Sequence, residues 1–402
     1  ATQRAFAHLE PRARGVSRPE DGGWHFQGRR RVFADICRWL SVQPQPGLCR
    51  VSGSVGAGKS AVLGRLYTLS RKDYRDRVPP DALKATELPP LASIDCVLLP
   101  QRGYRDTFNE ICRGLGVVAT TRDELEASLK ERSRCPTLLV DGLDESDAPE
   151  CIADLLQSLA QTSARIIVGT RALRTGTWTI EPSLDIDLDT DPWLDTASVE
   201  KYVRRRLRDE GSADKTRAPA WRTHPAETAR AIVKHVGGNF LLASLCMTAL
   251  LAGSDQDPRD DSWRYPRSVD DALNVVFDAL GDDEPAIRQV LLPLAYAQGR
   301  GLPAGPLWSD LVKGLGGDRA RKLDRKNLDP TFVLTHAPWL VVADLVDGRV
   351  VYRLFHAALR EHLQADRPTA RMHGRIAATL ARHISSHRSD SRSSSADDYT
   401  YA

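Results

Sequence analysis

The sequence predicts an α/β domain, a parallel sheet with helices on both faces, followed by a helical domain and a winged-helix domain. Over residues 24–192, apolar runs of strand length alternate with amphipathic helical patterns, as in parallel sheets that are covered by helices. After Pro192 the helical patterns continue without strands. Within residues 339–356, Asp347-Gly348 separates two alternating apolar runs, and this pattern is typical of a β-hairpin. Helices followed by a hairpin indicate a winged-helix unit.

Five strands are predicted for the sheet. They cover residues 49–53, 94–100, 137–141, 165–170 and 184–188. One of the helices between them places four apolar side chains on a single face: Ile152, Leu155, Leu156 and Leu159. Residues 71–90 are polar and carry four prolines, so we expect a surface connection there.

Shifts in composition predict the domain boundaries. The expected order is an N-terminal lead segment (1–23), the α/β domain (24–192), a small helical domain (193–253), a linker (254–268), a winged-helix domain (269–365), and a helical start with a disordered tail (366–402). In the small helical domain an apolar stripe is formed by Val199, Tyr202, Val203 and Leu207, and residues 239–253 are apolar enough for a buried helix.

The composition is that of a globular protein. The chain has 402 residues, of which 41% are hydrophobic and 27% charged, enough for about two to four domains. Because 56 Lys and Arg face 53 Asp and Glu, the formal net charge is only +3, which gives no global reason to expect nucleic acid or a membrane surface as the main partner. No apolar run approaches the ~18 residues of a membrane span.

The cysteines and the chain ends predict the compartment and the context. Seven scattered cysteines without a C-x-x-C pair fit neither a disulfide framework nor a zinc site, so we expect a reducing cytoplasm. The chain begins at Ala1 and ends in a Ser/Asp/Arg-rich stretch, residues 385–402, that cannot form a core. We therefore expect a piece of a longer polypeptide.

Residues 53–60, GSVGAGKS, match the phosphate-binding pattern G-x-x-x-x-G-K-[ST] between a predicted strand and a predicted helix. The glycines let backbone N–H groups turn toward phosphates, and the helix N-terminus adds partial positive charge. We expect Lys59 to reach the β- and γ-phosphate oxygens and the Ser60 hydroxyl to ligate Mg²⁺. The alternative is a glycine-rich turn with a solvent-facing lysine. The predicted contacts come from Gly53, Ser54, Val55, Gly56, Ala57, Gly58, Lys59, Ser60 and Ala61.

A phosphate-binding loop needs an acidic partner on a neighbouring strand, and the apolar run 137–140 ends in Asp141. We expect Asp141 to hold Mg²⁺ through water, with Asp144 or Glu145 positioning an attacking water. Both acids also fit the N-terminal cap and first turn of the following helix. Arg171, after the next strand, is placed to bind a γ-phosphate, or it is an ordinary surface arginine.

Together these motifs resemble the STAND class of signal-transducing P-loop NTPases, which includes NACHT and NB-ARC proteins. The sequence DGLDE at 141–145, followed by GTR at 169–171, carries the resemblance. The similarity extends over residues 20–365, and its style is most like that of actinobacterial members.

The resemblance implies three further contacts with a bound nucleotide. Gly28-Arg29 matches a family motif that approaches the adenine. Asn239-Phe240 lies where the family has a GxP-type motif, although the usual proline is replaced. His356 matches the winged-helix histidine that touches the β-phosphate of ADP in the closed state; without the resemblance it fits a partly buried histidine of an amphipathic helix.

In functional terms the resemblance implies an ATP/ADP switch with slow hydrolysis, which self-associates when ATP replaces ADP. Family members usually carry effector and sensor modules, and neither is recognisable in this chain. Two alternatives stay open: a working kinase or motor ATPase, and a DNA-associated AAA+ or origin-recognition-like ATPase or winged-helix regulator. Residues 348–363 are as apolar as they are basic, which favours packing within the protein over nucleic acid.

Overall fold

The computed structural model describes most of the chain, in two compact units, Ala1–Val269 and Asp270–Ala402. The described residues are 2–16, 19–42, 45–84, 94–99, 103–171, 181–209, 220–251, 257–260, 263, 265–297, 301–321, 323, 325–346, 349–365 and 367–387. Within them, no helix is long and apolar enough to cross a membrane.

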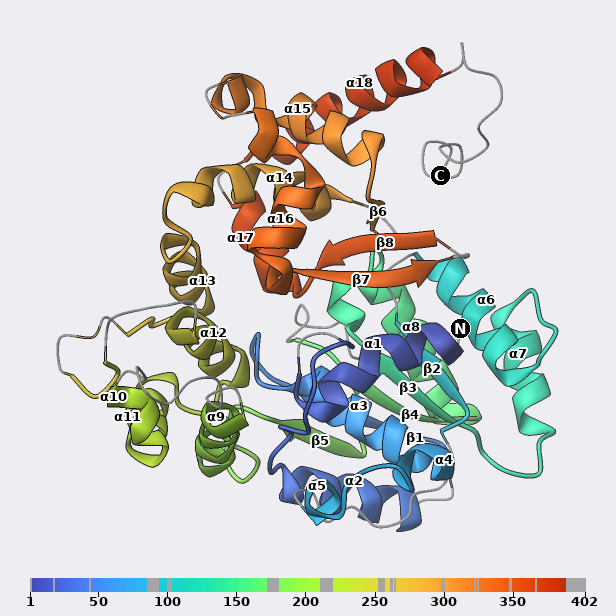
Figure 1. Ribbon diagram of the computed structural model, residues 1–402. Coiled ribbons are helices and arrows are strands. Elements are labelled where there is room, and N and C mark those ends of the chain that lie inside the picture. The colour runs from blue at the N-terminus through green and yellow to red at the C-terminus, as the bar shows by residue number, and fades with distance from the viewer. Residues whose placement is uncertain are drawn as a thin grey trace. The chain divides into compact units, whose positions relative to one another are not determined.

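The first unit is built on a five-stranded parallel sheet in the order β2-β3-β4-β1-β5 (Figure 1). Its strands are β1 (Gly47–Ser52), β2 (Cys96–Leu98), β3 (Thr137–Asp141), β4 (Arg165–Gly169) and β5 (Leu184–Asp187). The predicted α/β fold with a parallel sheet is confirmed. The second strand is shorter than the predicted 94–100, and position 100 lies outside the described residues.

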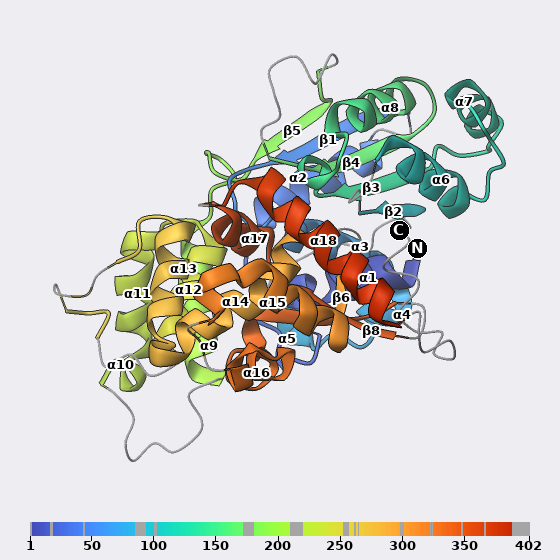
Figure 2. The same cartoon turned by 90° about the horizontal axis from the view of Figure 1, so that it is seen from above.

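Helices cover both faces of this sheet, as Figure 2 shows for α3 and α8. One face packs against α6 (Tyr104–Leu115), α7 (Arg122–Lys130) and α8 (Pro149–Thr162), and the other against α1 (Thr2–Arg14), α2 (Arg30–Val42) and α3 (Lys59–Ser70). Along β3, Leu138 and Val140 pack against the helices α6–α8, whereas Leu139 packs against α1–α3, because successive side chains of a strand point to opposite faces. The predicted apolar face of α8 is buried.

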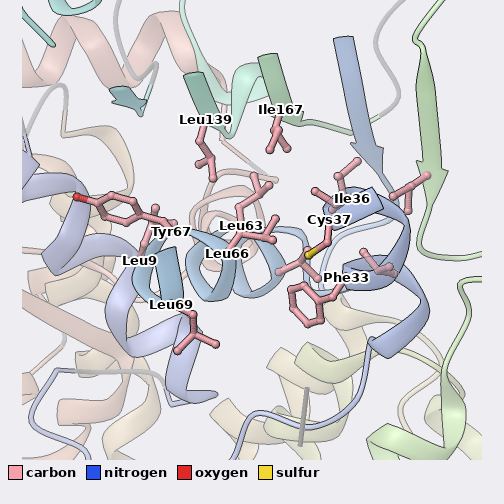
Figure 3. Close-up of a cluster of buried hydrophobic side chains, with 14 of the residues drawn as sticks. Leu9, Phe33, Ile36, Cys37, Leu63, Leu66, Tyr67, Leu69, Leu139 and Ile167 are labelled. Atoms are coloured by element: carbon pink, nitrogen blue, oxygen red, sulfur yellow. The ribbon is translucent and has the colours of Figure 1, made fainter. Parts of the chain in front are cut away.

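The lead segment contributes α1 to the core. Leu9 is fully buried and lies against α3 near Leu66 and Tyr67 (Figure 3). The two helices approach closely because a Cβ on Gly64 would lie only 2.6 Å from the Leu9 carbonyl oxygen. The buried Arg65 of α3 donates to the Ala13 carbonyl at 3.3 Å. Helix α1 is thus an integral layer of the α/β unit.

The expected surface connection at 71–90 is wrong for its first part. This stretch forms two short helices, α4 (Lys72–Arg75) and α5 (Pro80–Lys84). Tyr74, Val78 and Ala82 are buried in the same core as α1. Pro80 does not interrupt a helix, because it occupies the first helical position, where its missing N–H costs nothing. Residues 85–93 lie outside the described residues.

The remainder of the first unit is helical, with α9 (Thr196–Asp209), α10 (Ala220–Thr223), α11 (Pro225–Val236) and α12 (Phe240–Leu251). The stripe predicted on α9 is buried, and α9 packs against α11 and α12. Most of the described α12 side chains are buried as well, so the predicted apolar helix is confirmed.

The second unit combines helices with a three-stranded antiparallel sheet in the order β6-β8-β7. Its elements are α13 (Val269–Asp278), α14 (Glu284–Tyr296), β6 (Leu302–Pro303), α15 (Pro306–Arg321), α16 (Pro330–His336), β7 (Val341–Val346), β8 (Arg349–Leu354), α17 (Ala357–Gln364) and α18 (Thr369–His387), with short 3₁₀ turns at Gly281–Asp283, Arg325–Leu328 and Pro338–Leu340. Val346 pairs with Arg349, so the predicted hairpin is present, and its turn Asp347-Gly348 lies outside the described residues.

Replacing Leu9 by Ala should destabilise the first unit by about 2–5 kcal/mol, the cost of truncating a fully buried leucine. Urea unfolding followed by circular dichroism measures the loss. Ala7→Ser, on the exposed side of the same helix, should change stability by only about 0.5 kcal/mol. Equal unfolding curves for Leu9→Ala and the parent would show that α1 is not part of the core.

Candidate nucleotide-binding site

The phosphate-binding loop joins the end of β1 to the start of α3, the strand-loop-helix context that the motif requires. Gly53, Gly56 and Gly58 have backbone φ angles of 147°, 86° and 98°, which residues other than glycine rarely adopt. A Cβ on Gly56 would lie 2.4 Å from Asn239 Oδ1. The glycines therefore allow the loop to turn, and at Gly56 they also leave room for Asn239 to approach the backbone.

Lys59 lies across this loop. Its Nζ donates to the carbonyl oxygens of Gly53 at 2.7 Å and Ser54 at 2.9 Å. Burial lowers the pKa of Lys59, and the negative charge of Asp144 is the largest effect that opposes this. The ammonium is thus held by neutral carbonyl groups, which an anionic ligand can replace with a stronger, charge-assisted partner.

The outer arm of the loop is held by Asp189, which the sequence interpretation missed. Asp189 accepts hydrogen bonds from the Ser54 backbone N–H and from Ser54 Oγ, the latter at 3.1 Å. Asp189 follows β5 closely. Its position after the last predicted strand was the available signal, because parallel strands end at the same edge of a sheet.

Ser60 and Asp141 are brought together as predicted for a magnesium site. Ser60 Oγ donates to Asp141 Oδ1 at 3.0 Å, and the carboxylate is buried. Burial alone would raise the pKa of Asp141, but hydrogen bonds from His8 and Ser60 and the charges of His8 and Arg12 lower it below its ordinary value. A buried carboxylate that stays ionised beside a hydroxyl is suited to hard cations such as Mg²⁺.

Asp144 and Arg171 form a pair. Asp144 Oδ1 accepts from the Arg171 backbone N–H at 2.9 Å, and its Oδ2 lies 3.1 Å from Arg171 Nε. Asp144 and Glu145 belong to the 3₁₀ turn η1 (Leu143–Glu145), whereas Ala148 occupies the N-cap of α8. Asp144 is thus neither a helix cap nor a free base here, and Arg171 is more than a surface arginine. Glu145 is exposed.

Arg29 supports the loop from the side of β5. The buried guanidinium donates to the carbonyl oxygens of Ala57 at 2.6 Å, Trp193 at 2.7 Å and Leu188 at 3.2 Å. A Cβ on Gly28 would lie 1.7 Å from Ser198 Oγ, so only glycine fits there. Arg29 thus braces the backbone around the loop, and the contact of Gly28 and Arg29 with an adenine stays a prediction.

The start of α12 is hydrogen-bonded to the phosphate-binding loop. Asn239 Nδ2 donates to the Val55 carbonyl at 2.8 Å, and the N–H groups of Phe240 and Leu241 donate to the Gly56 carbonyl at 3.1 and 3.3 Å. The Phe240 ring centroid is 5.5 Å from the Arg29 guanidinium carbon. Asn239 and Phe240 therefore contact the loop backbone, which local sequence does not reveal, and their contact with an adenine stays a prediction.

His356 belongs to the second unit, where it is the N-cap of α17. Its Nδ1 accepts from the Ala358 N–H at 3.0 Å. Because Nδ1 accepts, the neutral ring carries its proton on Nε2. The contact between His356 and a bound phosphate stays a prediction.

The groups around the loop fit a nucleotide phosphate together with a Mg²⁺ ion. Proteins usually hold Mg²⁺ with one or two carboxylate or hydroxyl groups, together with phosphates and water. Ser60 supplies a hydroxyl and Asp141 a carboxylate. Lys59 and the N-terminal N–H groups of α3 supply the positive charge that phosphates require. Val55, Ala57 and Ala61 contribute backbone to this region, within the loop or the first turn of α3.

The comparisons with known proteins find similarity among solved structures alone. No protein-family model and no curated protein matches the chain. A STAND ATPase with a tetratricopeptide repeat sensor from Pyrococcus horikoshii is 14% identical, with a TM-score of 0.46, over 91% of this chain and 47% of that one. The chain thus spans about half the length of that protein.

Two further solved structures are similar to the chain at lower scores. The Drosophila origin recognition complex bound to DNA is 10% identical, with a TM-score of 0.35, over 84% of this chain and 94% of that one. Domain III of the Thermotoga maritima replication initiation protein DnaA is 13% identical, with a TM-score of 0.31, over 62% and 92%. At these identities the likeness concerns the fold alone.

Proposed function

We propose that the chain is an ATP/ADP-dependent signalling switch of the STAND class, closed with ADP and self-associating with ATP. The observation that carries the proposal is the set of hydrogen bonds from the start of α12 to the Val55 and Gly56 carbonyls. A phosphate-binding loop bonded to a helical segment can pass a change of its ligand to that segment. A loop that only binds substrate needs no such connection.

In this proposal the loop N–H groups and Lys59 bind the β- and γ-phosphates. Ser60 and Asp141 hold Mg²⁺, the latter through water, and the ion when bound neutralises phosphate charge. Lys59 exchanges the Gly53 and Ser54 carbonyls for phosphate oxygens. Gly28 and Arg29 define the adenine side, where the buried Arg29 keeps the backbone fixed.

Hydrolysis is proposed to be slow because Asp144 and Arg171 engage each other. Arg171 uses its Nε to contact Asp144 Oδ2, so the group proposed to bind the γ-phosphate and the carboxylate proposed to orient a water hold each other. Glu145 is the second candidate for this role. A carboxylate whose two oxygens are already engaged is a poor general base, and this suits timing more than rapid turnover.

The second unit is proposed to be a winged-helix domain that closes on the bound ADP. The order of α14, β6, α15, α16 and the β7-β8 hairpin agrees with a winged-helix unit and supports this proposal. His356 would donate from Nε2 to the β-phosphate in the closed state. Effector and sensor modules, fused or separate, would be the partners of the open, ATP-bound state, and we propose a cytoplasmic location.

Lys59→Ala should remove tight nucleotide binding, because the loop then lacks the cation that faces the phosphates. The loss should be several kcal/mol, about 100-fold or more in affinity. Equilibrium titration with a fluorescent ADP measures it. Lys72→Ala, the same change at an exposed lysine of α4, should bind as the parent does; an unchanged affinity of Lys59→Ala would refute the phosphate-binding assignment.

Asp141→Ala should weaken the dependence of nucleotide affinity on Mg²⁺ while leaving some binding, because Lys59 and the loop remain. The same titration is made in Mg²⁺ and in chelator. The control is Asp147→Ala, an exposed acid nearby, which should keep the parent's response. If Asp141→Ala also responds to Mg²⁺ as the parent does, Asp141 has no part in holding the ion.

His356→Ala should shift the switch toward its open form. Loss of a charge-assisted hydrogen bond of ~1.5–3 kcal/mol changes the open/closed ratio roughly 10- to 100-fold. ADP release by stopped flow should become faster, and light scattering should show more self-association in ATP.

Because His356 also caps α17, the sharper variant is His356→Asn, which keeps a capping acceptor and removes the imidazole. It should release ADP as fast as His356→Ala does. His336→Ala, at an exposed position of α16, serves as the control. A parental ADP release rate in both His356 variants would reduce this residue to a helix cap.

A further inference from the structure

Helix α1 brings a histidine to the proposed metal-binding carboxylate. His8 Nε2 lies 3.5 Å from Asp141 Oδ2, and the two side chains are 15% and 4% exposed. The imidazole also contributes to holding the pKa of Asp141 below its ordinary value. Ser60 occupies the other oxygen, Oδ1. Each oxygen of Asp141 therefore faces its own polar group, Ser60 of α3 at Oδ1 and His8 of the lead segment at Oδ2.

The position of His8 is fixed by the core and not by a flexible tether. The next residue, Leu9, is fully buried, and its carbonyl rests against Gly64 of α3. Near the far end of α1, the Glu10 carboxylate accepts from Tyr74 Oη at 3.0 Å. These contacts set both the rotation and the depth of α1, and hence the direction of the His8 side chain.

Arg12 lies one turn further along α1 and reinforces the arrangement. Its Nη1 donates to the His8 carbonyl at 2.5 Å. Burial lowers the pKa of Arg12, and the charges of Asp141 and Glu145 oppose this effect. The guanidinium thus lies in the field of both carboxylates while it is bonded to the peptide group that carries His8.

We propose that His8 is a positioning residue for Asp141, donating from Nε2 to Oδ2 so that the carboxylate is held in the orientation that receives the Mg²⁺ hydration shell. This inference rests on the proposed function. A carboxylate held at one oxygen can rotate about its Cβ–Cγ bond, whereas donors at both oxygens fix its plane. Groups that orient a ligand in this way typically change metal affinity 10- to 100-fold when they are removed.

The proposal also makes the docking of α1 dependent on the nucleotide state. If His8 improves Mg²⁺ binding through Asp141, then bound Mg²⁺-nucleotide must stabilise the docked α1 by the same coupling free energy. Hydrogen exchange of the α1 amides should therefore slow when Mg²⁺-ADP is added. This readout needs no catalytic turnover.

The test compares His8→Ala, His8→Asn and His8→Gln. Fluorescent ADP is titrated at increasing Mg²⁺, and the Mg²⁺ concentration for the half-maximal rise in ADP affinity is recorded. His8→Ala should require about 10-fold more Mg²⁺ with unchanged affinity in chelator. His8→Asn, whose amide is too short, should behave likewise, while His8→Gln, whose amide reaches farther, should restore at least part of the parental value.

Two controls separate this role from a structural one. Alanine is the best helix former, so His8→Ala does not weaken α1 intrinsically, and thermal unfolding should be close to that of the parent. Ala7→Ser changes an exposed residue of α1 next to His8 and touches neither Asp141 nor the contacts that fix the helix, so it should keep the parental Mg²⁺ requirement. The slowing of α1 hydrogen exchange by Mg²⁺-ADP should be smaller in His8→Ala than in the parent.

The outcomes distinguish failure of the His8 proposal from failure of the proposed nucleotide-dependent function. A parental Mg²⁺ requirement in both His8→Ala and His8→Asn overturns the positioning role. A lower requirement also overturns it, since His8 would then compete with the ion. If the parent itself binds no nucleotide, or binds it without regard to Mg²⁺, the proposed function fails, whatever the His8 variants do.

Discussion

The hydrogen bond from Ser60 to Asp141 joins the start of α3, the helix that follows β1, to the end of β3, and the site is organised around it. In the sheet order, β4 lies between β3 and β1, so the bond must pass over the end of β4. That strand ends in Gly169, where a Cβ would lie 3.3 Å from Asp141 Oδ1 and 2.5 Å from Leu63 Cδ1. The missing side chain on the middle strand allows α3 and β3 to meet.

The parts of the fold that could be predicted are those that local sequence determines. Strands β3 and β4 are buried on both faces and therefore appear as uninterrupted apolar runs. The glycines, Lys59 and Ser60 lie within eight residues of one another, so their cooperation is visible in the sequence. Helix α1 is different: it is polar on average and contains Pro11, and its burial depends on the shape of α3, which the sequence of α1 does not encode.

The same reasoning explains which site residues were missed. The contacts in question join residues far apart in the sequence. Asp189 is 135 positions from Ser54, His8 is 133 positions from Asp141, and Asn239 is 184 positions from Val55. No spacing rule connects such pairs, because their contact is created by the strand order and by the packing of helices on the sheet. The Asp144–Arg171 pair was closer to prediction, since both follow adjacent parallel strands and such ends converge.

Peptide geometry gives the contact between α12 and the loop a direct consequence for the phosphate site. In a trans peptide the C=O and the following N–H point in opposite directions. Because Asn239 holds the Val55 carbonyl, the N–H of Gly56 in the same peptide group points away from the Asn239 amide. A shift of α12 that rotates this peptide must therefore also turn the Gly56 N–H, which the proposed function assigns to the phosphates. In the proposed function the helical segment and the nucleotide would thus act on opposite ends of one rigid peptide group.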